Sequence, residues 1–145
     1  MLDQRIIEQG KFAPCYSKSK VSDAISEIVN MVNLTLDQTQ LKIVHTRMKG
    51  DEIRFDVRRL QQVLLNILSN AIKYQRVGEI TVTYDVQRQE NNKAIVQVQV
   101  VDRGQGMTNE QRLRIFEPFG GQTSEKIKTR MSNGVGLSIC KQLCQ

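Results

Sequence analysis

The pattern of apolar and polar positions along the chain predicts two long helices and several strands. Apolar side chains recur at helical spacing from Val21 to Leu36 and again from Leu60 to Tyr74. Four shorter runs, at 41–46, 53–55, 79–88 and 94–102, are predicted to be strands because they are rich in β-branched residues or alternate between apolar and polar residues. The last two runs flank a polar turn and should pair as an antiparallel hairpin. The pattern therefore predicts an α/β fold, a two-layer sandwich with helices packed on one face of a mixed β-sheet.

Each predicted helix has a residue near its start that can cap it. Ser22 is the candidate cap of the first helix. Asp56 can accept a hydrogen bond from the first turn of the second helix, and Phe55 can pack onto Leu60 across that cap. The apolar stripe of the second helix is expected to consist of Leu60, Val63, Leu64, Ile67, Ala71 and Tyr74.

Three polar residues border this stripe in a single line. Asn66, Asn70 and Lys73 lie at positions i, i+4 and i+7. Asn is unfavourable inside a helix because its side chain competes for backbone hydrogen bonds. The row is either a satisfied polar edge or a set of ligands for a bound anion and its metal, since Asn oxygens suit Mg²⁺ and Lys suits phosphate.

A carboxylate followed by two glycines ends the last predicted strand. The run from Asp102 to Met107 includes Gly104 and Gly106, which allow positive φ and a close approach of the backbone to a ligand. Such a turn alone is also typical of a plain loop.

Two more motifs follow. Ile115 to Phe119 places two aromatic residues around a proline, an arrangement that can anchor a loop. Gly134 to Leu137 opens an apolar helix, whose unpaired N–H groups and dipole suit a phosphate. The same glycines could equally form a tight junction between a loop and a helix.

Together, in this order, the four motifs resemble those of the catalytic ATP-binding domain of sensor histidine kinases. That domain belongs to the gyrase/heat-shock-chaperone/histidine-kinase/MutL (GHKL) ATPase superfamily with the Bergerat ATP-binding fold. In this chain Asn66–Tyr74 resembles its N box and Asp102–Met107 resembles its first glycine box. Ile115–Phe119 resembles its F box, and Gly134–Leu137 resembles its second glycine box. The long segment between the glycine boxes corresponds to the family's ATP lid, and we expect it to be mobile from about Thr108 to Ser132.

The resemblance implies a role for each matching position. Asp102 would accept a hydrogen bond from the adenine amino group, Asn70 would coordinate Mg²⁺, and Lys73 would lie near the phosphates. Asn66 would lie close to the metal in a supporting catalytic role. The other implied ATP-binding residues are Tyr74, Gly104, Gly106, Met107, Phe116, Phe119, Gly134, Val135, Gly136 and Leu137.

Asn66 also distinguishes branches of the superfamily. Gyrase, MutL and chaperone ATPases typically have a Glu at this position that activates water, whereas Asn is a weak base. The resemblance therefore implies an ATP-dependent histidine kinase that uses ATP and Mg²⁺. A regulatory module that senses nucleotide without transferring phosphate is the alternative.

The only histidine, His45, lies in a strand-like run without the acidic neighbours of a phosphoacceptor box. The acceptor is therefore expected on another domain of the same kinase. Residues 1–16 resemble the end of that helical domain and its linker, and residues 17–145 the ATP-binding domain without its last strands. The resemblance further implies a receiver domain as downstream partner, a homodimeric full-length protein and a cytoplasmic location, while the parent protein could be membrane-anchored.

Composition agrees with one domain. The chain has 145 residues, of which 39% are hydrophobic and 25% charged. Its net charge of +6 is scattered and lacks aromatic interleaving, so we expect no nucleic-acid binding. No apolar run reaches the length of a membrane span, and we expect no membrane contact by this segment. The three cysteines show no metal-ligand spacing and are expected to be free thiols.

Overall fold

The computed structural model describes residues 13–46, 51–117 and 136–144. In chain order its elements are β1 (Ser17–Lys20), α2 (Val21–Thr35), β2 (Leu41–His45), β3 (Glu52–Phe55), α3 (Val57–Tyr74), β4 (Gly78–Arg88), β5 (Ala94–Val101), α4 (Asn109–Arg114) and α5 (Gly136–Leu143).

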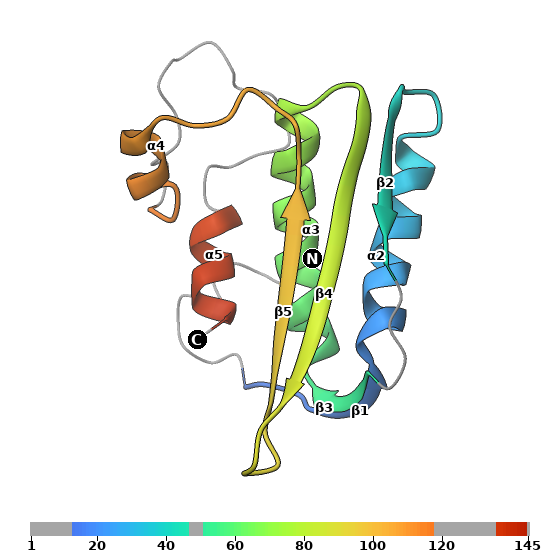
Figure 1. Ribbon diagram of the computed structural model, residues 1–145, viewed down its shortest axis with the longest axis vertical. Coiled ribbons are helices and arrows are strands. Elements are labelled where there is room, and N and C mark those ends of the chain that lie inside the picture. Colours follow the sequence, from blue (N-terminus) through green and yellow to red (C-terminus); the bar gives the residue numbers. More distant parts are fainter. Residues whose placement is uncertain (1–12, 47–50, 118–135, 145) are drawn as a thin grey trace.

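The strands form a mixed sheet and a separate short ladder. The sheet has the order β2-β4-β5, in which β2 runs parallel to β4 and β5 runs antiparallel to it. The antiparallel hairpin predicted from the sequence is confirmed. Strands β1 and β3 pair antiparallel with each other. In Figure 1, α2 and α3 lie behind the strands of the sheet, so the helices cover one of its faces. The predicted α/β architecture is confirmed.

Alternation along β4 determines which face of the sheet the helices cover. Ile80, Val82 and Tyr84 are buried, while the intervening positions are half-buried or exposed. On α3 the fully buried positions are Leu64 and Leu68. The predicted stripe of this helix is therefore correct in its middle and wrong at its end, because Leu68 belongs to the core and Tyr74 is 43% exposed.

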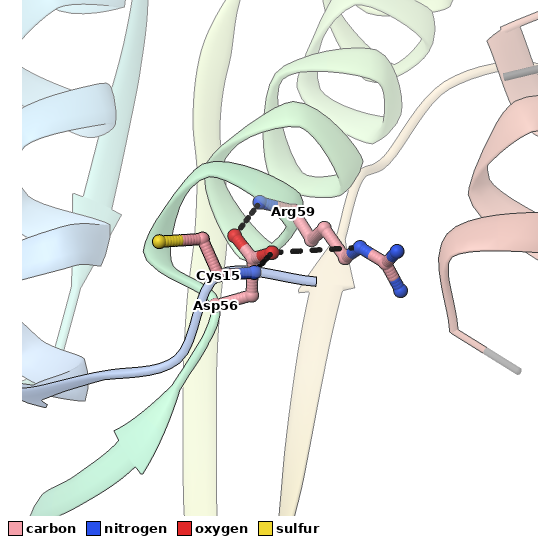
Figure 2. A network of polar contacts seen from close by, with 3 residues as sticks. All are labelled: Cys15, Asp56 and Arg59. Carbon is pink, nitrogen blue, oxygen red and sulfur yellow. Dashed lines mark hydrogen bonds and ion pairs between the residues drawn. The ribbon is translucent and has the colours of Figure 1, made fainter. Parts of the chain in front are cut away.

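Asp56 starts α3 as predicted. It is the N-cap residue, and its carboxylate accepts a hydrogen bond from the Arg59 backbone N–H at 3.1 Å. The same carboxylate accepts the Cys15 N–H at 2.8 Å and forms an ion pair with the Arg59 side chain at 3.5 Å (Figure 2). Asp56 thus connects the segment before β1 to the helix that carries the predicted N box.

The predicted cap of α2 is wrong. Ser22 lies inside the first turn, and the N-cap residue, Lys20, makes no side-chain capping bond. Instead Asp51, distant in sequence, caps the turn: its side chain accepts the Ser22 N–H at 2.5 Å and its carbonyl accepts the Val21 N–H at 3.2 Å. The buried Asp51 carboxylate also accepts the Tyr84 hydroxyl at 3.0 Å. One acidic residue therefore joins α2 to the core face of β4.

This bonding makes Asp51 a source of pH-dependent stability. Burial alone raises the pKa of its carboxyl, but the hydrogen bonds from Ser22 and Tyr84 outweigh it and hold the pKa below the ordinary value of 3.8. Because the folded-state pKa is depressed, the stabilisation is fully present above pH 3.8 and is lost as the pH falls through the folded-state pKa.

We expect Asp51→Asn to lower the free energy of unfolding by about 1–3 kcal/mol at pH 7, because two buried donors lose their charged acceptor. The variant should also lose less stability than the parent when the pH is lowered toward about 3. Urea denaturation at several pH values measures both effects. Asp85→Asn, at an exposed position of β4, is the matched control. Equal acid sensitivity of Asp51→Asn and the parent would contradict this role.

Two short elements were not predicted. Strand β1 is entirely polar in sequence and forms by pairing with β3. Helix α4 begins with a capping box, in which the Thr108 hydroxyl accepts the Gln111 N–H and the Gln111 side chain accepts the Thr108 N–H. That Thr-x-x-Gln signal was present in the sequence. The proximal part of the predicted lid therefore contains a short helix, and the lid from residue 118 onward lies outside the described residues.

Candidate nucleotide site

The predicted polar row lies on α3 as the helical spacing requires. Asn66, Asn70 and Lys73 are all half-buried, at the border between the packed and the exposed sides of the helix. Asn66 is held in place, since its Oδ1 accepts a hydrogen bond from Gln62 Nε2 at 3.2 Å. The Lys73 ammonium lies over the Tyr74 ring, 5.4 Å from its centroid. The row thus presents amide groups and one cation along the last turns of α3.

The loop after β5 packs directly against the end of this helix. A Cβ added to Gly104 would lie 2.9 Å from the Tyr74 carbonyl oxygen and 2.9 Å from an oxygen of Asp102. Both distances are shorter than real side chains allow, so this close approach requires glycine. The predicted N box and the first glycine box are therefore in contact, although almost thirty residues separate them in the sequence.

Asp102 is exposed at the start of the same loop, and its carboxylate is oriented. Its Oδ1 accepts the Gly104 N–H at 2.9 Å, which is a local Asx-type turn. A carboxylate accepts several hydrogen bonds, so the group can still receive a donor from a ligand. Further along, Gly106 has φ +72°, a conformation that favours glycine, and Met107 is 56% exposed.

Helix α5 packs against α3, the helix that carries the predicted N box (Figure 1). Gly136 begins α5, and Leu137 is half-buried. The buried Cys140 thiol lies 3.7 Å from the Val63 carbonyl oxygen, to which it can donate. Burial raises the pKa of this thiol, while a hydrogen bond with the Asn66 side chain partly offsets the rise. Asn66 is therefore in contact with both its own helix and α5.

The predicted F box is less integrated within the described residues. Phe116 follows α4 and is 48% exposed. Helix α4 has no extensive packing against another described helix or strand. Three further predicted site residues, Phe119, Gly134 and Val135, lie outside the described residues. The described contacts thus join the predicted N box to the first glycine box and to α5 through Cys140, while the roles of the second glycine box and the F box stay predictions.

The donor set fits a magnesium ion that is held mainly by a nucleotide. Within the described ranges no group of three or more His, Cys, Asp or Glu residues could hold a metal ion. Mg²⁺ commonly takes one or two protein oxygens and completes its shell with phosphates and water. Asn66 and Asn70 can supply such oxygens from neighbouring turns of one helix.

Comparison with known proteins agrees with these features. A profile of the family described as histidine kinase-, DNA gyrase B-, and HSP90-like ATPase matches residues 55–145. The non-motile and phage-resistance protein of Caulobacter vibrioides is 34% identical over 144 residues, which are 99% of this chain and 17% of that protein. The autoinducer 2 sensor kinase/phosphatase LuxQ of Vibrio vulnificus is 28% identical over 148 residues, or 100% of this chain and 17% of that protein. The chain thus spans about a sixth of the length of these relatives.

Solved structures show the same fold. Full-length ShkA in complex with AMPPNP matches with a TM-score of 0.69 at 23% identity, covering 91% of this chain and 26% of that one. The chain belongs to the family of histidine kinase-, DNA gyrase B- and HSP90-like ATPases. Within the described residues no helix is long and apolar enough to cross a membrane.

Proposed function

We propose that this chain binds Mg-ATP and donates the γ-phosphate to a histidine on a separate helical domain, as the catalytic module of a two-component sensor histidine kinase. The observation that carries the proposal is the contact between the loop after β5 and the end of α3. Gly104 lies against the Tyr74 carbonyl, which holds Asp102 near the helix end that carries Asn70 and Lys73. This contact supports a site in which a base acceptor lies close to a phosphate-binding row.

Within this site each group has a distinct task. The Asp102 carboxylate accepts the adenine amino group, and Tyr74 packs along the base and ribose. Lys73 lies near the phosphate chain, Asn70 supplies an oxygen for Mg²⁺, and Asn66 lies close to the metal in a supporting catalytic role. When bound, Mg²⁺ neutralises charge on the phosphates. Phosphoryl transfer needs mostly positioning and charge neutralisation, which such a site can supply without a protein nucleophile.

The absence of a carboxylate at position 66 favours a kinase over an ATPase. An amide is a poor general base, so bound ATP is not readily attacked by water. Asn66 is instead engaged with Gln62 and Cys140, an arrangement that fixes its orientation. The γ-phosphate is therefore kept for an acceptor side chain. By the same proposal, the partners are the phosphoacceptor domain, a receiver domain downstream and a second copy of the full-length kinase.

We expect no self-labelling when the isolated chain is incubated with Mg-ATP. His45 lies in β2, half-buried and paired with Val82, away from the candidate site. Mixed with the histidine-containing helical domain of the same kinase, the chain should transfer phosphate to that histidine. Labelling with radioactive ATP shows whether the chain or the helical domain carries the phosphate. Acid and base treatment then shows whether the phosphate is attached to a histidine. Acid-labile phosphate mapped to His45 would contradict the proposed division of labour.

Asn70→Ala should selectively weaken the Mg²⁺-dependent part of nucleotide binding, because Mg²⁺ depends on few and well-placed protein oxygens. Affinity for a non-hydrolysable ATP analogue, measured with and without Mg²⁺, should fall about tenfold with the metal and little without it. Asn30→Ala, the same change at an exposed position inside α2, is the control. An equal loss with and without Mg²⁺ would show that Asn70 only supports the helix.

A further inference from the structure

Gln75 is a buried polar residue that the site described above does not use. It follows directly after α3, is 5% exposed, and leaves the helix in an extended conformation. Its backbone N–H still donates to the Ala71 carbonyl at 2.9 Å. A buried amide side chain must find hydrogen-bond partners within the protein, so the contacts of this residue show what it holds together.

All three contacts of the Gln75 side chain go to backbone groups. Its Nε2 donates to the Val77 carbonyl at 3.0 Å and to the Glu79 carbonyl at 3.1 Å, and its Oε1 accepts the Arg103 N–H at 2.5 Å. Only one orientation of the amide satisfies this set, because two partners can only accept and the third can only donate. The side chain therefore joins the end of α3, the start of β4 and the loop after β5.

The bond to Arg103 acts on the residue that the proposed function uses for the base. The Arg103 amide belongs to the peptide bond that follows Asp102, so Gln75 holds the backbone at the very point from which the Asp102 side chain leaves. Gly104 lies on the other side of this peptide, in contact with the Tyr74 carbonyl and with its N–H on Asp102 Oδ1. The position of the Asp102 carboxylate is thus fixed by Gln75 through Arg103 and by Gly104.

We propose that Gln75 is a positioning residue that sets the place of Asp102 relative to the polar row of α3 and thereby determines selectivity for adenine. The inference rests on the proposed function, since it assumes that Asp102 receives the base. Among the described hydrogen bonds, only the one from the Arg103 N–H to the Gln75 side chain ties Arg103 to the end of α3. A side chain that only joined α3 to β4 would affect nucleotides of every base equally.

Gln75→Met tests this, because methionine has a similar length and cannot make these bonds. The probes are a non-hydrolysable ATP analogue, its inosine counterpart with oxygen in place of the 6-amino group, and tripolyphosphate, all with Mg²⁺. We expect the variant to lose about tenfold in affinity for the adenine analogue and about twofold or less for the other two. Gln99→Met, the same change at an exposed position of β5, should behave as the parent.

A second variant and a ligand-free measurement guard against a folding defect. Gln75→Asn keeps the amide but is too short to reach all three partners, and it should lose the same selectivity. Amide exchange of Arg103 in the nucleotide-free chain should accelerate about tenfold or more in both variants, whereas amides of β4 beyond Glu79 should keep their protection.

The outcomes separate this inference from the proposed function. If the parent binds the adenine analogue selectively and either folded variant keeps that selectivity, the role of Gln75 is wrong and the proposed function stands. Equal losses for all three probes, or failure of both variants to fold, would show a general structural role and would also overturn the inference. A folded parent that binds none of the probes would contradict both.

Discussion

Asp102→Ala should abolish adenine-nucleotide binding at micromolar ligand while leaving the fold intact. The carboxylate is exposed at the surface of the loop, so its removal leaves no cavity in the core. A charged hydrogen bond to the base contributes about 1.5–3 kcal/mol, which corresponds to about a 10- to 150-fold loss in affinity. Asp102→Asn keeps an oxygen acceptor without the charge and should fall between the parent and the alanine variant.

Isothermal calorimetry with a non-hydrolysable ATP analogue measures this loss, and thermal unfolding checks that the fold is retained. Asp85→Ala, which removes an exposed carboxylate from β4, is the control for net charge. An Asp102→Ala variant that binds the analogue as tightly as the parent would contradict the role of Asp102 in recognising adenine.

The largest effect on stability is expected from Leu68→Ala. Leu68 is completely buried in the core cluster beneath the sheet, on the helix that carries the polar row. Truncation of a buried leucine to alanine costs about 2–5 kcal/mol, from lost burial and the cavity left behind. Because Leu68 lies between Asn66 and Asn70 in sequence, loosening of this helix should also weaken nucleotide binding.

Urea denaturation gives the change in the free energy of unfolding directly. Leu113→Ala makes the same substitution at a position of α4 that is 83% exposed, and should change stability by about 0.5 kcal/mol or less. A loss below about 1 kcal/mol for Leu68→Ala would show that α3 is not packed as the structure has it.

The elements that could be predicted from the sequence are those with a sustained period. Helix α3 repeats apolar positions along its 18 residues, and β4 alternates from Ile80 to Tyr84, so most of the buried face follows from the pattern, although Leu68 was missed on α3. The cap at Asp56 was also predictable, because an N-cap bond is local and links residues three apart. Within the site, the helical spacing alone was enough to align Asn66, Asn70 and Lys73.

The features that escaped prediction depend on contacts between distant segments. Asp51 caps α2 through Ser22, which lies 29 residues away in the sequence, and no local sequence pattern predicts such a bond. Gln75 looks like an ordinary polar residue after a helix, and only the folded chain shows that it is buried and joined to Arg103, 28 residues away. Strand β1 has no apolar position to mark it, since pairing with β3 is what makes it a strand.

Titration of the parent chain with a non-hydrolysable ATP analogue, with and without Mg²⁺, tests the central claim most directly. A site built from Asp102 and the polar row of α3 predicts saturable binding of one analogue per chain, tighter when Mg²⁺ is present. Absence of binding up to about 1 mM analogue, in a chain that circular dichroism shows to be folded, would contradict the claim that this surface is an ATP site.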